Sequence, residues 1–230
     1  VVYWSTASVR RHKGLKSNTE YSYSAKARNA VGIETMLSGA GSKVTPPPSP
    51  TGVEITGISA TNIDLAWESV EGASSYGVKA SSGEGIWEET QPSLINTYYS
   101  WPGLGANTLY RFEVTAANET GSGAASVGIS TYTGIQSPET FGIGEVGATI
   151  IKIGVMDELS NLGIGDSGWR IKELRRDTDS GWQVSRDSYT FSGLVPNTSY
   201  WFKMNARNSV GMETEYSTEY GTYTLALDPR

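Results

Sequence analysis

Acidic side chains are the residues of this sequence that could most directly do chemistry. Two carboxylates across a cleft can hydrolyse a glycosidic bond when burial raises the pKa of one of them. The candidates form three groups: Glu84 with Glu88 and Glu89, Asp157 with Glu158, and Asp177 with Asp179. Calcium is conceivable at the second and third groups, but the dense alternating oxygen ligands of a calcium loop are missing. All three groups lie in predicted connections between short strands, so we expect solvated carboxylates and predict no catalytic or metal site.

Composition limits the remaining nucleophilic and metal chemistry. His12 is the only histidine, and the chain has no cysteine. A catalytic triad, a histidine metal cluster, a disulfide and a thiolate site are therefore excluded. His12 lies beside Arg10, Arg11 and Lys13, so we expect a solvated basic loop there, with contact to an acidic neighbour as the alternative.

A glycine pattern at residues 142–147 matches the dinucleotide-binding fingerprint by letter. That fingerprint needs a helix to follow it, so that the helix N-terminus meets the pyrophosphate. Here the pattern runs into residues 148–153, Ala-Thr-Ile-Ile-Lys-Ile, which have the composition of a strand. We therefore predict no nucleotide and no other cofactor.

A group of aromatic residues is the one candidate for surface binding. Tyr98, Tyr99 and Trp101 lie close together in the sequence. Exposed flat rings of this kind stack against sugars, so polysaccharide is a possible partner. The alternative is that one or two of these rings pack into a core. Two sequons for N-glycosylation also occur, at Asn118 and Asn197.

A repeat organises the chain. The copies begin at Gly14, Gly103 and Gly193, a spacing of about 90 residues. Each copy has an Asn-Thr pair, a Tyr two residues after the Thr, and then alternating apolar and polar residues up to an Asn-x-x-Gly. The alternating sets are Tyr21, Tyr23, Ala25 and Ala27; Tyr110, Phe112, Val114 and Ala116; and Tyr200, Phe202, Met204 and Ala206. Such alternation predicts a strand with one buried face, and Asn-x-x-Gly suits the hairpin after it.

These residues resemble the fibronectin type III family. Leu-x-x-x-Thr-x-Tyr followed by an alternating strand is similar to that family's tyrosine corner. Residues 63–67, Ile-Asp-Leu-Ala-Trp, resemble its second strand with the core tryptophan, and Tyr76-Gly77-Val78 resembles its third. The last copy departs from the pattern, with Val155 at the tryptophan position and a longer connection up to Trp169. The resemblance implies an all-β fold of tandem immunoglobulin-like, seven-strand antiparallel β-sandwiches.

Proline- and glycine-containing links divide the chain into three expected units. Unit 1 (residues 1–45) is the C-terminal half of a domain, unit 2 spans 49–133, and unit 3 spans 137–226. The expected core of unit 2 contains Trp67, Tyr76, Leu104, Tyr110, Phe112 and Val114. That of unit 3 contains Trp169, Ile171, Leu194, Tyr200, Phe202 and Met204.

Unit 1 matches only the later strands of the repeat. We expect the missing strands either upstream in a longer polypeptide or donated by a neighbouring subunit, because about 45 residues without disulfides or metal seldom fold alone. The end of the chain, Leu225 to Arg230, reads as the start of a further linker.

The expected function is a non-catalytic structural or interaction segment. A formal charge of -6 argues against nucleic-acid partners, and no apolar run is long enough to cross a membrane. The resemblance suggests a spacer, stalk or fibre segment of a larger extracellular or cell-surface protein, with roles such as adhesion or filament formation. Its partners would be other domains of the polypeptide or neighbouring copies. The alternatives are an accessory region of a secreted polysaccharide-degrading enzyme and a receptor ectodomain.

Overall fold

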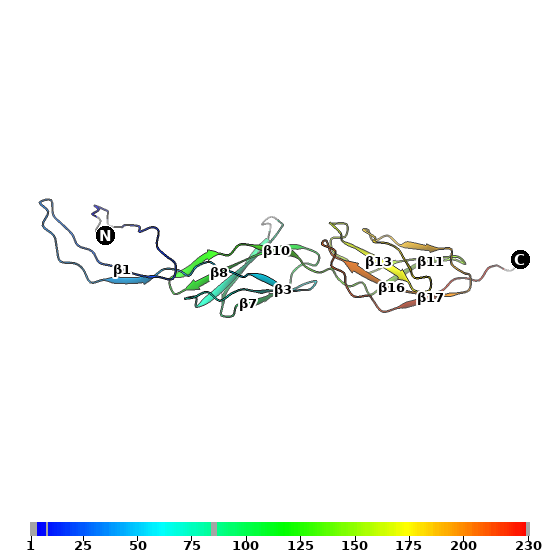
Figure 1. The fold of residues 1–230 in the computed structure, drawn as a ribbon. Coiled ribbons are helices and arrows are strands. Elements are labelled where there is room, and N and C mark those ends of the chain that lie inside the picture. The colour runs from blue at the N-terminus through cyan, green and yellow to red at the C-terminus, as the bar shows by residue number, and fades with distance from the viewer. Residues whose placement is uncertain (1–3, 8, 84–86, 229–230) are drawn as a thin grey trace.

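The computed structural model describes residues 4–7, 9–83 and 87–228. In these residues the regular secondary structure consists of strands, and no α-helix is present. Figure 1 shows the units following one another along an extended molecule, from the hairpin of unit 1 to the sandwich of unit 3.

Unit 2 is a sandwich of two antiparallel sheets. One sheet has the order β3-β4-β7, and the other has the order β10-β8-β5-β6 with β9 also paired to β8. The bounds are β3 Glu54–Ile58, β4 Ile63–Ala66, β5 Ser75–Ser82, β6 Trp87–Leu94, β7 Tyr98–Trp101, β8 Leu109–Asn118, β9 Gly121–Ala125 and β10 Ile129–Tyr132. The described residues thus form eight strands instead of the expected seven, because the last strand is divided. At the division the Ser126 hydroxyl accepts a hydrogen bond from the Val114 amide, at 2.9 Å.

Unit 3 repeats this architecture with sheets ordered β11-β12-β15 and β14-β13-β16-β17. The bounds are β11 Phe141–Val146, β12 Ile150–Val155, β13 Gly168–Glu173, β14 Thr178–Asp179, β15 Tyr189–Ser192, β16 Ser199–Arg207 and β17 Tyr220–Tyr223. The glycine pattern at residues 142–147 lies in β11 and its turn, and β12 follows it. The helix that a dinucleotide site needs is therefore replaced by a hairpin.

The two cores contain every side chain expected in them. All twelve predicted residues are buried, from 7% exposed at Tyr110 to fully buried at Phe112, Val114, Trp169, Ile171, Phe202 and Met204. In unit 3 the fully buried Trp169 belongs to the same core cluster as Val155, which stands at the usual tryptophan position. Burial of aromatic and aliphatic side chains between the two sheets supplies the main driving force for each sandwich.

The tyrosine corner has the same geometry in all three units. The backbone amides of Lys16, Gly105 and Val195 donate to the hydroxyls of Tyr21, Tyr110 and Tyr200, at 3.0, 2.9 and 2.8 Å. The asparagine of each corner has a left-handed backbone, with φ of 44° at Asn18, 47° at Asn107 and 48° at Asn197. Asparagine tolerates this conformation better than most residues, which explains its place in each copy.

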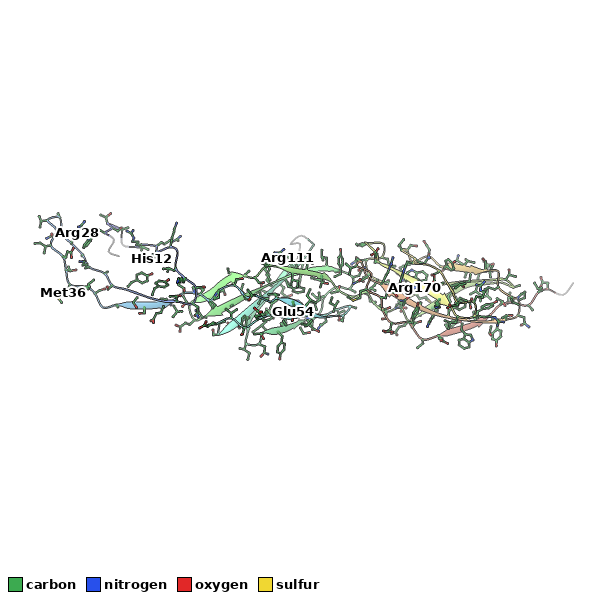
Figure 2. All side chains as sticks on the ribbon, viewed as in Figure 1. His12, Arg28, Met36, Glu54, Arg111 and Arg170 are labelled. Carbon is green, nitrogen blue, oxygen red and sulfur yellow. The ribbon has the colours of Figure 1, made fainter. Side chains whose placement is uncertain are left out.

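Unit 1 is a hairpin with no second sheet among the described residues. Strands β1 (Glu20–Tyr23) and β2 (Gly41–Val44) pair antiparallel, and the Arg28–Glu34 bridge lies beyond them towards the tip. Figure 2 shows the side chains of Arg28 and Met36 projecting from this arm. The face that is buried in units 2 and 3 is open here, and Tyr23 is 48% exposed.

The corner geometry predicts the effect of removing one hydroxyl. Tyr200→Phe should lower the free energy of unfolding of unit 3 by about 0.5–1.5 kcal/mol, because the Val195 amide loses its acceptor while the ring stays packed. Phe202→Ala should cost about 3–5 kcal/mol, because it leaves a cavity in the core. Urea unfolding followed by near-ultraviolet circular dichroism measures both. Equal losses in the two variants would contradict this assignment of roles.

Candidate functional site

The predicted aromatic group is divided by the alternation of β7. Tyr98 points outwards and is 64% exposed, whereas Tyr99 packs partly against the core and Trp101 is only 2% exposed. The rings of Tyr99 and Trp101 meet edge to face, 5.6 Å apart. Trp101 is thus a core residue and cannot be part of a binding surface. Binding by Tyr98 stays a prediction.

Most of the candidate carboxylates have partners close to them in the structure. Glu88 pairs with Lys79 at 2.9 Å, Gln91 donates to Glu89 at 3.3 Å, and Glu158 is within 3.4 Å of Arg186. Glu84 lies outside the described residues. Among the residues that the structure describes, no three histidine or acidic side chains gather closely enough to hold a metal ion.

Local donors set the charge state of the two aspartates considered for calcium. The hydrogen bond from Lys172, 2.7 Å from Asp177, together with the charge of that ammonium, holds the pKa of Asp177 below its ordinary value. Burial would raise the pKa of Asp157, but the backbone amides of Thr140 and Glu139, at 2.6 and 2.8 Å, outweigh it and lower that pKa. Asp179 accepts from the Gly181 amide, at 2.8 Å. A lowered pKa opposes a role as general acid. The three aspartates instead accept hydrogen bonds from groups of their own unit.

His12 is exposed and has aromatic neighbours. Its Nδ1 lies 2.9 Å from the hydroxyl of Tyr23, and its ring meets Tyr21 and Tyr23 edge to face. The basic loop thus rests on the open face of unit 1. The two sequons also differ, since the amide of Asn118 donates to the Thr45 carbonyl at 3.0 Å, whereas Asn197 is exposed.

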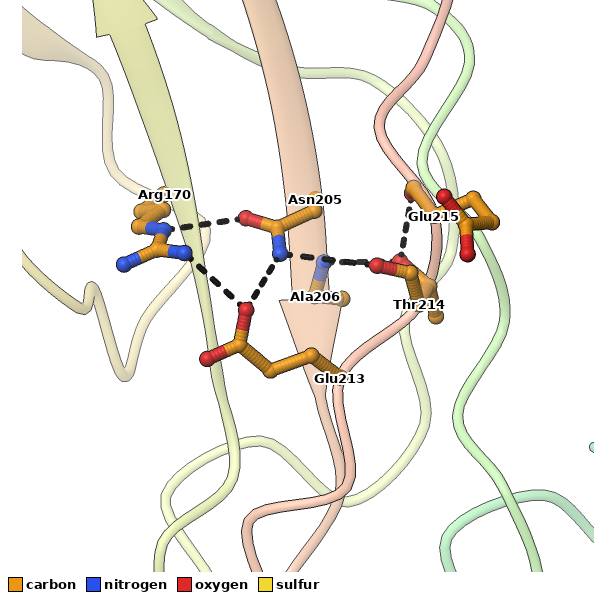
Figure 3. A network of polar contacts seen from close by, with 6 residues as sticks. All are labelled: Arg170, Asn205, Ala206, Glu213, Thr214 and Glu215. Atoms are coloured by element: carbon orange, nitrogen blue, oxygen red, sulfur yellow. Dashed lines mark hydrogen bonds and ion pairs between the residues drawn. The ribbon is translucent and has the colours of Figure 1, made fainter.

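The outer face of β13 and β16 has a polar network that the sequence did not predict. Arg170 donates to the Asn205 side chain at 3.1 Å and to Glu213 at 2.9 Å, and Asn205 donates to the same Glu213 carboxylate, as Figure 3 shows. The Arg170 guanidinium also lies 4.5 Å from the ring centre of Trp182, and Arg207 lies at the same distance from that ring. These contacts tie the loop around residue 182 and the segment around residue 213 to the sheet.

A second cluster of polar contacts joins unit 2 to unit 3, at the corner residue Asn107. This side chain is 1% exposed, and its amide donates to the carbonyls of Ser160 and Asn161, at 3.1 and 2.9 Å. Its carbonyl oxygen accepts from the backbone amide and the hydroxyl of Ser209, at 2.7 and 2.8 Å. The full hydrogen-bonding capacity of the Asn107 side chain is therefore used across one boundary.

Unit 3 supplies its part of this joint from two loops. Asn161 lies in the connection between β12 and β13. Its side-chain amide donates back to the backbone carbonyl of Asn107, at 3.1 Å. Ser209 lies in the hairpin after β16, where the Asn208 amide donates to the carbonyl of Thr133, at 3.0 Å. The long connection that distinguished unit 3 in the sequence is thus the part that wraps the corner of unit 2.

One contact of this joint recurs between units 1 and 2. Asn118 is equivalent to Asn208 in the repeat, and it donates to Thr45, the equivalent of Thr133, at the same 3.0 Å. In both hairpins the oxygen of this asparagine accepts a backbone amide of its own turn. One side chain therefore orders a hairpin and docks it on the preceding unit. The repeated Asn-x-x-Gly was a signal for this role, although the sequence indicated only the turn.

Comparison with known proteins gives one family model and several partial relatives. Residues 48–132 match the model of the fibronectin type III domain. The chain is 36% identical over 86 residues to a poly(3-hydroxybutyrate) depolymerase of Ralstonia pickettii, over 37% of this chain and 16% of that enzyme. It is 33% identical over 98 residues to receptor-type tyrosine-protein phosphatase F of Bos taurus, over 41% of this chain and 5% of that protein.

A solved structure shows the same fold. A two-domain fibronectin type III segment of chicken tenascin aligns with a TM-score of 0.57 at 18% identity, covering 76% of this chain and 99% of that segment. The chain spans only a small part of the two relatives that it matches in sequence. In the described part of the chain, no helix has the length and apolar character of a membrane span.

The contacts of Asp157 predict a pH-dependent contribution to stability. Because its pKa is lowered on folding, the stabilisation is present above the unfolded pKa of the carboxyl and is lost as the pH falls through the folded one. Asp157→Asn should therefore reduce the thermal stability of unit 3 slightly at pH 7, by less than about 1 kcal/mol for a group this exposed. Melting curves of both proteins from pH 7 to pH 2 should converge at the acid end. A difference that grows with acidity would contradict the assignment.

Proposed function

We propose that this chain, whose residues 48–132 belong to the fibronectin type III family, is a non-catalytic spacer segment of a larger extracellular or cell-surface protein. Its task would be to hold successive β-sandwiches in a fixed orientation. The observation that carries this proposal is the joint at Asn107, because a freely hinged chain would have no use for a buried amide that is fully hydrogen bonded across the boundary.

The link between units 2 and 3 is itself part of the packed structure. Thr133 is fully buried and Ile135 is 4% exposed, with Ile135 packed in the core of unit 3. A Gly-Ser linker would instead behave as a random coil. Bending at this link would expose Ile135 and break the bonds of Asn107, and each buried polar group left without a partner costs about 1–3 kcal/mol.

The setting of the spacer is supported by the kind of domain and by its neighbours. The sandwiches have an extended arrangement, and the described residues contain no group of three histidine or acidic side chains that could hold a metal ion. A relative with a receptor-type name fits an extracellular stalk. Stalks, adhesive surface proteins and filaments all need length with limited bending, which fixed joints provide.

A second candidate is an accessory region of a secreted polymer-degrading enzyme. The similarity to a depolymerase favours it, and the polymer named for that relative is a polyester rather than a polysaccharide. In this case, too, the chain would be a spacer, but it would position a catalytic domain relative to an insoluble polymer.

Two matched variants test the joint. Asn107→Gly removes the side chain without straining the left-handed backbone, because glycine accepts positive φ. Asn197→Gly makes the same change at the exposed corner of unit 3. We expect Asn107→Gly to broaden the angle between units 2 and 3, measured by residual dipolar couplings and small-angle X-ray scattering, while Asn197→Gly leaves it unchanged.

Two results would contradict a fixed orientation of units 2 and 3. If the wild-type couplings already require many interdomain angles, or if both glycine variants behave alike, the joint does not fix the orientation and the spacer proposal loses its support. Separate unfolding curves for the two units would show that neither variant has simply lost a domain.

Absence of catalysis is a separate prediction. Incubation of the chain with poly(3-hydroxybutyrate) granules and with soluble polysaccharides should release no hydroxybutyrate and no reducing sugar, because the candidate carboxylates are dispersed over two units and those described are held by local partners. Product analysis by chromatography checks this. Turnover that disappears on changing one carboxylate would overturn it.

A further inference from the structure

Trp201 is an exposed aromatic ring on the outer face of unit 3. Its neighbours in β16, Tyr200 and Phe202, point into the core and are 1% and 0% exposed. Trp201 points the other way and is 50% exposed, on the same face as Lys203. The exposed part of this ring makes no core contact, so it does not contribute to the stability of the fold.

The residue opposite Trp201 lets its ring lie flat on the sheet. Trp201 pairs with Gly221 of β17, and a Cβ atom added to Gly221 would lie 2.9 Å from two atoms of the indole. Any larger residue at position 221 would therefore push the ring away from the sheet. One face of the indole thus rests on the backbone of β17, and the other is available to a ligand.

Uncommitted polar groups surround the ring. Trp201 lines a shallow surface hollow together with Leu174, Arg175, Ser199 and Glu219. The turn that bears Arg175 is held against β16 by the hydrogen bond from the Leu174 amide to the Trp201 carbonyl, at 2.9 Å. Within the described residues, no hydrogen-bond or ion-pair partner is found for the guanidinium of Arg175, the hydroxyl of Ser199 or the carboxylate of Glu219, although the guanidinium lies 5.8 Å from the ring centre of Tyr200.

The arrangement is specific to unit 3. At the same register unit 2 has Arg111 opposite Ser130, and unit 1 has Ser22 opposite Ser42. The fibronectin type III fold therefore does not need a tryptophan over a glycine at this point. The need to form a stable sandwich therefore does not explain the Trp201–Gly221 pair.

We propose that the hollow around Trp201 is a carbohydrate-binding site that takes a sugar ring of a polysaccharide chain. The apolar face of a pyranose would stack on the open face of the indole. Its hydroxyls would accept from Arg175 and Ser199 and donate to Glu219, so that each polar group finds a partner. The site adds binding to the spacer role and does not depend on it.

The chemistry of the hollow separates a sugar from two other polymers. A polyester such as poly(3-hydroxybutyrate) has acceptors but no donors along its chain, so it leaves Glu219 unsatisfied. Single-stranded nucleic acid also stacks on aromatic rings, but it needs a positive groove, whereas Arg175 and Glu219 balance each other and the chain has a net charge of -6.

Affinity gel electrophoresis of the whole chain tests the site. The gels contain hydroxyethyl cellulose, xylan, laminarin or polygalacturonate, and retardation measures binding. We expect at least one polysaccharide to retard the wild type, Trp201→Ala to weaken its binding about tenfold or more, and Glu219→Gln to weaken it less. Tyr23→Ala is the matched control, because it removes a ring of similar exposure, 48%, from unit 1 and should change nothing.

Several outcomes would overturn the proposal. These are no retardation by any of the four polysaccharides, retardation unaffected by Trp201→Ala, or equal loss in Tyr23→Ala. Binding to poly(3-hydroxybutyrate) granules or to oligo(dT) in place of the polysaccharides would also refute it. Melting curves identify a misfolded variant, and Trp201→Phe, which keeps a ring, should retain part of the binding where Trp201→Ala does not.

Discussion

The arrangement of this molecule depends on how the end of each β-sandwich is closed. A threonine after the last strand donates from its hydroxyl into the tyrosine-corner turn and accepts the amide that follows the corner asparagine. The distances from Thr45, Thr133 and Thr224 are 2.6, 2.6 and 2.7 Å to the turn carbonyl and 3.0 Å to the amide in each case. This closure fixes where the chain leaves each unit, and it holds the corner asparagine in the left-handed conformation at the tip.

From that fixed tip the joints follow. Asn107 can be buried across the boundary because both its backbone and the link after it are already held by the closure. The neighbouring unit contributes a hairpin asparagine that docks on the threonine carbonyl, and this contact is the same at both boundaries. The joint between units 2 and 3 adds the long connection with Asn161, so the two boundaries share one contact and differ in how completely the corner is enclosed.

The outer faces of the sheets are free to differ because the closure and the cores do not involve them. Unit 3 uses its outer face for the Arg170 network and for the ring of Trp201 on Gly221. In unit 2 the same face contains Lys79, Arg111 and Glu113, without a flat ring. A repeated architecture thus combines identical ends with faces that can be given separate binding properties.

The sequence by itself determined the fold, the repeat and the core, because alternation along a strand and a tyrosine three residues after an asparagine are local patterns with direct structural causes. It also indicated that Asn107 and Asn208 occupy turns. Only the tertiary structure decided that Trp101 is buried, since the register with β4 selects the face in that aromatic-rich strand. The alternation around Trp201 already placed this residue on the outer face, but only the structure showed its ring against Gly221 of β17. The joint could likewise not be predicted from the sequence, because Asn107 and Ser209 are brought together by the packing of two separate domains.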